Sequence, residues 1–115
     1  MDLSSTERRH YSPAVRRTDC TEILKALADR NRIRLVKALL KSSLSVNELA
    51  ETLTVSQYNA SKHLRVLRHA GIVHARTNGT RREYYITPKF RTALHQDEHL
   101  LDFGCCTFHF DRMIS

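Results

Sequence analysis

Residues 45–86 read SVNELAETLTVSQYNASKHLRVLRHAGIVHARTNGTRREYYI, and they contain the most specific fold signals of the chain. It begins with a capping box, because the Ser45 side chain can accept from the amide of Glu48 while the Glu48 side chain accepts from the amide of Ser45. Four apolar residues follow at helical spacing, Val46, Leu49, Ala50 and Leu53. Ser56 then caps a second helix, which ends before Gly71 and has its apolar face at Ala60, Leu64 and Leu67. Two short capped helices joined by a tight connection predict a helix-turn-helix.

A β-hairpin is predicted directly after Gly71. Residues 72–77 and 80–86 favour strands and flank Asn78-Gly79, a favoured pair for a two-residue type I′ turn, in which both positions need positive φ. Three arginines, Arg76, Arg81 and Arg82, lie close to the tip of this hairpin. Such a wing can reach phosphates or the minor groove of a duplex.

Helices are predicted on both sides of this unit. A first helix from about Ala14 to Leu27 carries an apolar stripe of Cys20, Ile23, Leu24 and Leu27, and Asp29 can cap a second with Ile33, Val36, Leu39 and Leu40 inward. Residues 89–101 favour a last helix, and residues 103–110 alternate as a strand with Cys106, Phe108 and Phe110 on one face. The sequence therefore predicts a mainly α fold with a small β-hairpin wing, a winged helix-turn-helix in the order α-α-α-α-β-β-α.

The 115 residues divide into three predicted parts. Residues 1–13 are a flexible N-terminal arm, residues 14–102 a winged helix-turn-helix domain, and residues 103–115 a cysteine-containing C-terminal extension. No apolar run approaches the roughly 20 residues of a membrane span, and the start, MDLSSTERRH, lacks the apolar stretch of a signal peptide. We therefore expect a cytoplasmic protein without a membrane partner.

The positive charge is concentrated in one region. The whole chain carries a net charge of +7, and residues 56–91 hold eight basic residues against Glu83 as their one acid, which is again +7. A basic block on a folded unit is typical of a nucleic-acid site. An acidic protein partner is the alternative for a winged helix with a basic face, and the salt dependence of binding separates the two.

The second capped helix has a polar face suited to the major groove. If Ala60, Leu64 and Leu67 face the core, the opposite face presents Tyr58, Ser61, Lys62, Arg65 and His69, with Gln57 beside them at the N-terminus. Gln57 can pair with adenine and Lys62 with guanine O6 and N7. Ser56 and the N-terminal amides suit a backbone phosphate.

Five segments form a recognisable set of motifs: ALADRNRIRL at 26–35, SQ at 56–57, SKHLRVL at 61–67, AGIV at 70–73 and NGTRREYYI at 78–86. Together they resemble the ArsR/SmtB family of transcriptional repressors, and the resemblance covers about residues 20–95. It adds His63 to the candidate DNA-binding residues. It also implies a homodimer built through the first and last helices, repression that an inducer releases, and an inverted-repeat operator with half-sites about 10 bp apart or a multiple of that.

The chain departs from the metal sites of that family. Residues 46–53, VNELAETL, lack the cysteines of the arsenic-sensing members, and the zinc pattern of the last helix is only half present. A zinc site is a second possibility for the ligands, from His95, Asp97, His99 and His109. A repressor without any ligand is another.

The cysteines are the leading candidates for the switch. The chain has three, Cys20 and the adjacent pair Cys105-Cys106. Soft sulfur ligands favour soft ions, so we predict that Cys105 and Cys106, with Cys20 as third ligand, bind As(III), Sb(III) or another soft metal ion. In the alternatives, Cys20 forms a disulfide or polysulfide bridge with one of the pair, or the cysteines only pack in the core. Because adjacent side chains of a strand point to opposite faces, a shared ion needs a bend near Gly104.

An enzyme is not expected from this sequence. It has no phosphate-binding glycine loop, no pair of carboxylates in an evident cleft and no nucleophile motif. We therefore expect no catalytic residues and no organic cofactor, and the expected partners are double-stranded DNA and a second copy of the chain.

Overall fold

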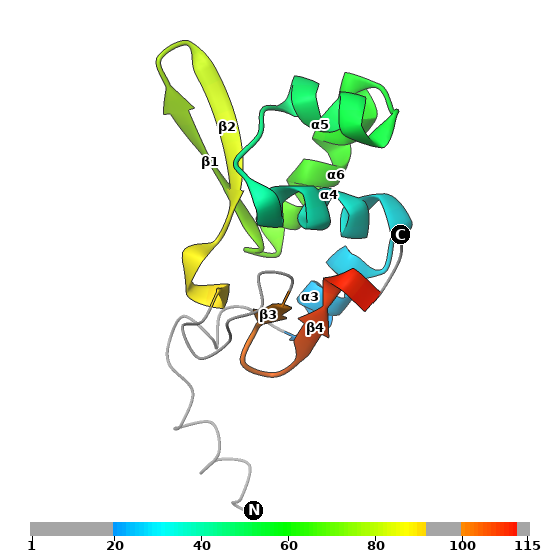
Figure 1. Ribbon diagram of the computed structural model, residues 1–115. Coiled ribbons are helices and arrows are strands. Elements are labelled where there is room, and N and C mark those ends of the chain that lie inside the picture. Colours follow the sequence, from blue (N-terminus) through cyan, green and yellow to red (C-terminus); the bar gives the residue numbers. More distant parts are fainter. Residues whose placement is uncertain (1–19, 92–99, 113–115) are drawn as a thin grey trace, which may run out of the picture.

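The computed structural model describes residues 20–91 and 100–112 (Figure 1). Four helices come first: α3 (Cys20–Leu27), α4 (Arg30–Lys41), α5 (Val46–Leu53) and α6 (Gln57–His69). The hairpin of β1 (Val73–Asn78) and β2 (Arg81–Ile86) follows and projects beside α5. A 3-10 turn (Pro88–Phe90), a short hairpin of β3 (Leu100–Asp102) and β4 (Thr107–His109) and a second 3-10 turn (Phe110–Arg112) complete the described chain. The predicted winged helix-turn-helix is confirmed.

The predicted N-caps are all present. Asp29 Oδ1 accepts from the amides of Asn31 and Arg32, at 2.8 and 3.1 Å. The capping box of α5 is complete in both directions, and Ser56 Oγ accepts from the Asn59 amide at 3.0 Å. These local bonds fix where each helix begins, because they satisfy amides that have no partner inside the helix.

Replacing Ser45 with alanine is expected to lower the free energy of unfolding by about 1 kcal/mol, because the amide of Glu48 loses its capping acceptor. Urea unfolding followed by circular dichroism measures this loss. Ser45→Asp restores an acceptor and is expected to recover most of it. Equal stability of the alanine variant and the wild type would mean that the capping bond contributes nothing to the fold.

The wing differs from its prediction at the turn. Asn78 pairs with Arg81 in the ladder, so the two loop residues are Gly79 and Thr80, one position later than expected. Gly79 has φ +70°, whereas Thr54 is the one non-glycine residue of the described chain with positive φ. The type I′ turn at Asn78-Gly79 is therefore wrong. The ladder extends to Asn78, and the glycine supplies the left-handed residue at the first loop position, as in a II′ turn.

The wing sheet is also joined by the segment before α5. Leu44 and Tyr84 exchange both backbone hydrogen bonds, with N–O distances of 3.1 and 2.8 Å, and form an isolated antiparallel bridge. This pairing fixes β2 against the connection between α4 and α5.

The predicted last helix is wrong where the structure describes it. Lys89 and Phe90 lie in a 3-10 turn and Leu100 and Leu101 in β3, while residues 92–99 of the predicted helix lie outside the described residues. β3 pairs with β4, with Leu101 opposite Phe108. Residues 100–102 form a strand because the alternating tail supplies backbone hydrogen-bond partners for them. The predicted arm, residues 1–13, and the first turns of the first helix, residues 14–19, also lie outside the described residues.

The first helix buries a slightly different face from the one predicted. Ile23, Ala26 and Leu27 are buried in α3, whereas Leu24 is 51% exposed. Leu24 is therefore no part of the core stripe within this chain, because the face toward α4 is centred on Ile23 and Leu27, one helical turn apart.

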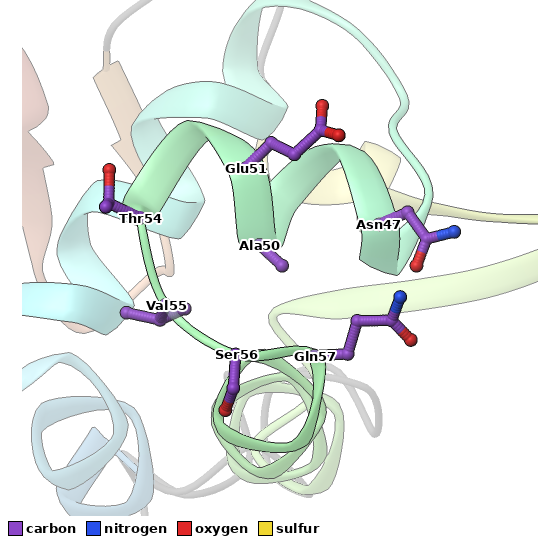
Figure 2. A pocket seen from close by; sticks show the side chains of 7 residues that line it. All are labelled: Asn47, Ala50, Glu51, Thr54, Val55, Ser56 and Gln57. Carbon is purple, nitrogen blue, oxygen red and sulfur yellow. The ribbon is translucent and has the colours of Figure 1, made fainter.

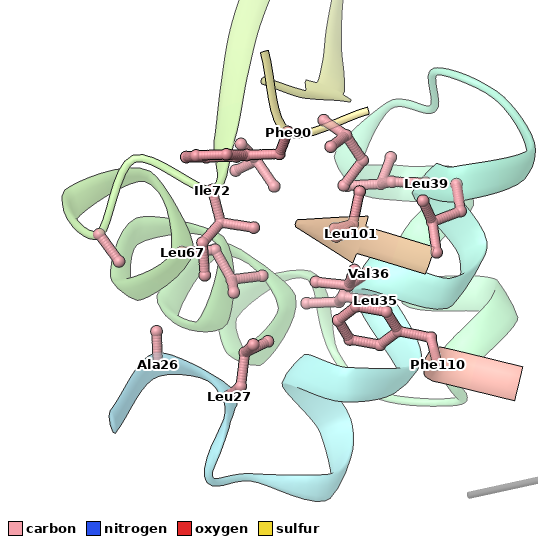
Figure 3. Packing of buried hydrophobic residues seen from close by; sticks show 14 of the residues in the cluster. Ala26, Leu27, Leu35, Val36, Leu39, Leu67, Ile72, Phe90, Leu101 and Phe110 are labelled. Carbon is pink, nitrogen blue, oxygen red and sulfur yellow. The ribbon is translucent and has the colours of Figure 1, made fainter. Parts of the chain in front are cut away.

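The tail packs into the same core as the helices (Figure 3). Phe103 and Phe110 are fully buried, and the rings of Phe90 and Phe103 lie 4.7 Å apart in an edge-on arrangement. Figure 3 shows Phe110 and Leu101 beside Leu35 and Val36 of α4. Residues 100–110 are thus an integral layer of the fold, which places the cysteines of the tail against α3.

Candidate DNA-reading surface and cysteine cluster

The recognition helix α6 has the two faces that the sequence predicts. Ala60, Leu64 and Leu67 are buried. The exposed residues include every predicted base or phosphate contact at its N-terminal end and along its outer face: Ser56, Gln57, Tyr58, Ser61, Lys62 and Arg65. Tyr58 is 72% exposed, and Lys62 Nζ lies 5.3 Å from the centre of its ring. This distance allows a weak cation–π attraction between two exposed side chains in the first half of the helix.

His63 lies on a different side of α6 from these residues. It is half-buried, and its Nδ1 is 3.3 Å from Arg32 Nη1. Arg32 also donates from Nε to the carbonyl of Ala26 at 2.6 Å and from Nη2 to that of Lys25 at 3.3 Å. His63 therefore contacts the first turn of α4, whose Arg32 also bonds the C-terminal end of α3.

A pocket lies between α5 and the start of α6 (Figure 2). Its lining comprises Asn47, Ala50, Glu51, Thr54, Val55, Ser56 and Gln57. Figure 2 shows the amide groups of Asn47 and Gln57 at the same end of this pocket. The prediction did not include Asn47. Asn47 is a polar residue directly after Val46 in the first turn of α5, and it is exposed. Its polarity at that position could have identified it from the sequence.

The three wing arginines are exposed but have different partners. Arg82 has its guanidinium carbon 5.7 Å from the centre of the Tyr84 ring. Arg76 stacks at 4.7 Å on Tyr85 and donates to Ser43 Oγ at 3.2 Å. Arg81 forms ion pairs with two carboxylates, those of Glu48 and Glu83.

Hydrogen bonds shift the pKa of both Glu48 and Arg81. The hydrogen bond from the Ser45 amide and then that from Arg81 lower the pKa of Glu48. The hydrogen bonds to Glu83 and Glu48 raise the pKa of Arg81. Both groups are thereby held in their charged forms.

The three cysteines meet between the start of α3 and the β3–β4 loop. Cys20 and Cys105 are joined by a disulfide with their Cα atoms 6.2 Å apart. Cys106 Sγ lies 3.4 Å from Cys20 Sγ and 3.8 Å from Cys105 Sγ. We call these residues the cysteine cluster; all three sulfurs lie within 4.8 Å of one another.

The expected bend near Gly104 is present. Gly104 has φ +94°, and its amide donates to Asp102 Oδ1 at 2.9 Å. This turn brings the side chains of Cys105 and Cys106 to the same side, which a straight strand could not do. Burial, and then the negative charge of Asp102, raise the pKa of the Cys106 thiol.

The residues of the zinc alternative are only partly described. His109 is half-buried on β4, opposite Leu100, while His95, Asp97 and His99 lie outside the described residues. The described helices include none that is long and apolar enough to span a membrane.

The comparisons with known proteins agree with this architecture. The family described as "Bacterial regulatory protein, arsR family" matches residues 29–75. The HTH-type transcriptional regulator Rv2034 of Mycobacterium tuberculosis is 44% identical over 72 residues, which cover 63% of this chain and 67% of the relative. A transcriptional repressor SmtB homolog of Synechocystis sp. is 42% identical over 64 residues, covering 56% of this chain and 48% of that protein.

A solved structure has a similar fold. The homodimeric winged helix-turn-helix DNA-binding domain of Mb0332 from Mycobacterium bovis is 31% identical, with a TM-score of 0.56 over 58% of this chain and 62% of the other. The match leaves much of both chains uncovered. From the family match and these relatives, the chain belongs to the arsR family of bacterial regulatory proteins and is a DNA-binding transcriptional regulator, not an enzyme.

Proposed function

We propose that the protein is a cytoplasmic, homodimeric repressor that leaves its operator when a thiophilic metalloid such as As(III) or Sb(III) binds the cysteine cluster. The observation that supports a thiophilic ligand is that three sulfurs from segments 85 residues apart lie within 4.8 Å of one another. A winged helix supplies the DNA-binding part.

DNA reading is assigned to the outer face of α6 and to the wing. Gln57 would pair with adenine and Lys62 with guanine, since both are exposed near the N-terminus of α6. Ser56 would contact a phosphate, and Arg76 and Arg82 would follow the backbone or minor groove. Their exposure supports these roles.

Two copies would bind an inverted repeat with half-sites about 10 bp apart or a multiple of that. The homodimeric state of the Mb0332 domain supports a dimer for this chain. Leu24, 51% exposed on α3, is a residue that a second copy would cover.

The sulfur geometry suits a three-coordinate soft ion once the cysteines are reduced. Two thiolates bound to one ion at about 2.3 Å and at near-tetrahedral angles lie about 3.8 Å apart. The distances from Cys106 Sγ to the other two sulfurs are 3.4 and 3.8 Å. Each thiol would replace one hydroxide of arsenite and release one water.

A structural route leads from the cluster to the recognition helix. Cys20 is the first residue of α3, and the last turn of α3 offers the carbonyls of Lys25 and Ala26 to Arg32. Arg32 in turn lies 3.3 Å from His63 on α6. A ligand that moves α3 relative to the tail would thereby alter the setting of α6.

Thiol oxidation is the second candidate, and the disulfide between Cys20 and Cys105 favours it. In this case the two thiols lose two protons and two electrons to a polysulfide or another thiol oxidant. In this candidate the disulfide, and not a bound ion, links α3 to the tail.

Arsenite titration of the reduced protein tests the metalloid. The probe is a duplex enriched by the wild type from a random pool, followed by fluorescence anisotropy. We expect arsenite to weaken binding by about 5- to 150-fold, the range of ordinary coupling between two sites. No change with arsenite or antimonite, but release by polysulfide, would replace the metalloid with the redox candidate; release by Zn(II) alone would favour the histidine site.

A further inference from the structure

Arg81 differs from the other wing arginines in forming ion pairs with two carboxylates, whereas Arg76 pairs with Glu83 alone among the described residues. Its Nη2 donates to Glu48 Oε1, and its Nε donates to Glu83 Oε2 at 2.9 Å. Glu48 Oε1 also accepts from the Ser45 amide at 2.9 Å. One carboxylate thus closes the capping box of α5 and holds the wing at the same time.

The contact is part of a continuous row between the wing and the segment before α5. Glu83 Oε1 lies 3.7 Å from Arg76 Nε, and Arg76 reaches Ser43 Oγ. We call Ser43, Glu48, Arg76, Arg81 and Glu83 the wing clamp. It lies beside the backbone bridge between Leu44 and Tyr84, and Figure 1 shows the connection to α5 running along β2.

We propose that Arg81 is a positioning residue for DNA binding, which locks the wing to the capping box of α5, and that its neighbour Arg82 makes the backbone contact. A phosphate would have to displace two carboxylates to bind Arg81. Arg82, by contrast, has no ion pair within the described residues. Because α5 packs directly on α6, the clamp sets the angle between the wing and the recognition helix.

The proposal rests on the DNA-binding half of the proposed function and is independent of the cysteine ligand. A wing held before DNA arrives loses less freedom on binding, so releasing it is expected to weaken binding. Glu48 itself touches no DNA in this account, and its effect is indirect.

Neutralising Glu48 gives opposite results for the two roles of Arg81. Glu48→Gln keeps an acceptor for the Ser45 amide, since glutamine also serves in a capping box, but it removes the charge facing Arg81. If Arg81 positions the wing, affinity for the enriched duplex falls about three- to tenfold in Glu48→Gln and in Arg81→Gln, and the double variant is no weaker than either. If Arg81 binds a phosphate, Glu48→Gln frees it and raises the affinity.

The salt dependence separates the adjacent arginines. We expect the slope of log K against log salt to fall by about one in Arg82→Gln and to stay unchanged in Arg81→Gln. Glu22→Gln removes an exposed carboxylate from α3, away from the wing. It is the charge-matched control for Glu48→Gln. A loss of about one in the slope of Arg81→Gln, with tighter binding of Glu48→Gln, overturns the proposal.

Amide hydrogen exchange in the free protein tests the clamp without DNA. Exchange over residues 73–86 is expected to speed up in Arg81→Gln and Glu48→Gln and not in Arg82→Gln. Unchanged wing exchange in Arg81→Gln would overturn the clamp whatever the DNA results. A different result is that wing exchange is faster in Arg81→Gln and Glu48→Gln while the wild type binds no duplex at all. This result would support the wing clamp and refute the proposed function.

Discussion

Replacing Gln57 and Lys62 together with alanine is expected to lower the affinity for the enriched duplex by at least about a hundredfold. Both side chains are exposed at the start of α6, and a good bidentate base contact contributes about 1–3 kcal/mol of discrimination. Neither residue packs in the core, so the free energy of unfolding should change little. Anisotropy titrations at fixed salt, with urea unfolding alongside, measure both effects.

The comparison with random DNA decides how these residues act. Lys25→Ala removes an exposed basic side chain from α3 and is the matched control, with an expected change of less than about twofold. Base contacts predict that the double variant loses far more affinity for the enriched duplex than for a random one. An equal loss on both duplexes would reduce Gln57 and Lys62 to backbone contacts.

Replacing Cys106 with serine is expected to weaken arsenite binding by at least about a hundredfold and to abolish arsenite-driven release from DNA. The serine oxygen fills the same space but is a hard ligand, so the three-sulfur site becomes a two-sulfur site. Ultraviolet absorption of the arsenic–thiolate bonds and anisotropy on the enriched duplex report binding and release separately. Affinity without arsenite is expected to stay within about twofold of the wild type.

The same variant separates the two candidate switches. Because the disulfide joins Cys20 and Cys105, Cys106→Ser should keep its response to polysulfide while losing its response to arsenite. Cys105→Ser/Cys106→Ser should lose both responses. Full arsenite release in Cys106→Ser would exclude the three-sulfur site.

The helix-turn-helix was predictable because its signals are local. Asp29, Ser45 and Ser56 each bond amides two or three residues away, so the sequence reports the start of each helix directly. The two faces of α6 follow from its apolar spacing for the same reason. The spacing of Ala60, Leu64 and Leu67 is therefore enough to predict which residues of α6 are exposed.

The last segment was not predictable because its structure depends on distant partners. Residues 89–101 have a helical pattern taken alone, but Leu100 and Leu101 find hydrogen-bond partners on β4. The meeting of Cys20 with the tail cysteines depends on that hairpin and on the turn at Gly104. The wing clamp was missed for a similar reason, since Glu48 and Arg81 are 33 residues apart.

Selection from a random duplex pool by the reduced protein, followed by competition with random DNA, tests whether the protein reads a specific DNA sequence as a dimer. We expect the selected duplexes to contain an inverted repeat with half-sites about 10 bp apart or a multiple of that. We also expect at least about 1,000-fold tighter binding to this repeat than to random duplex at the same salt concentration. A pool that yields no repeat, with enriched and random duplexes competing equally, would contradict a sequence-specific regulator.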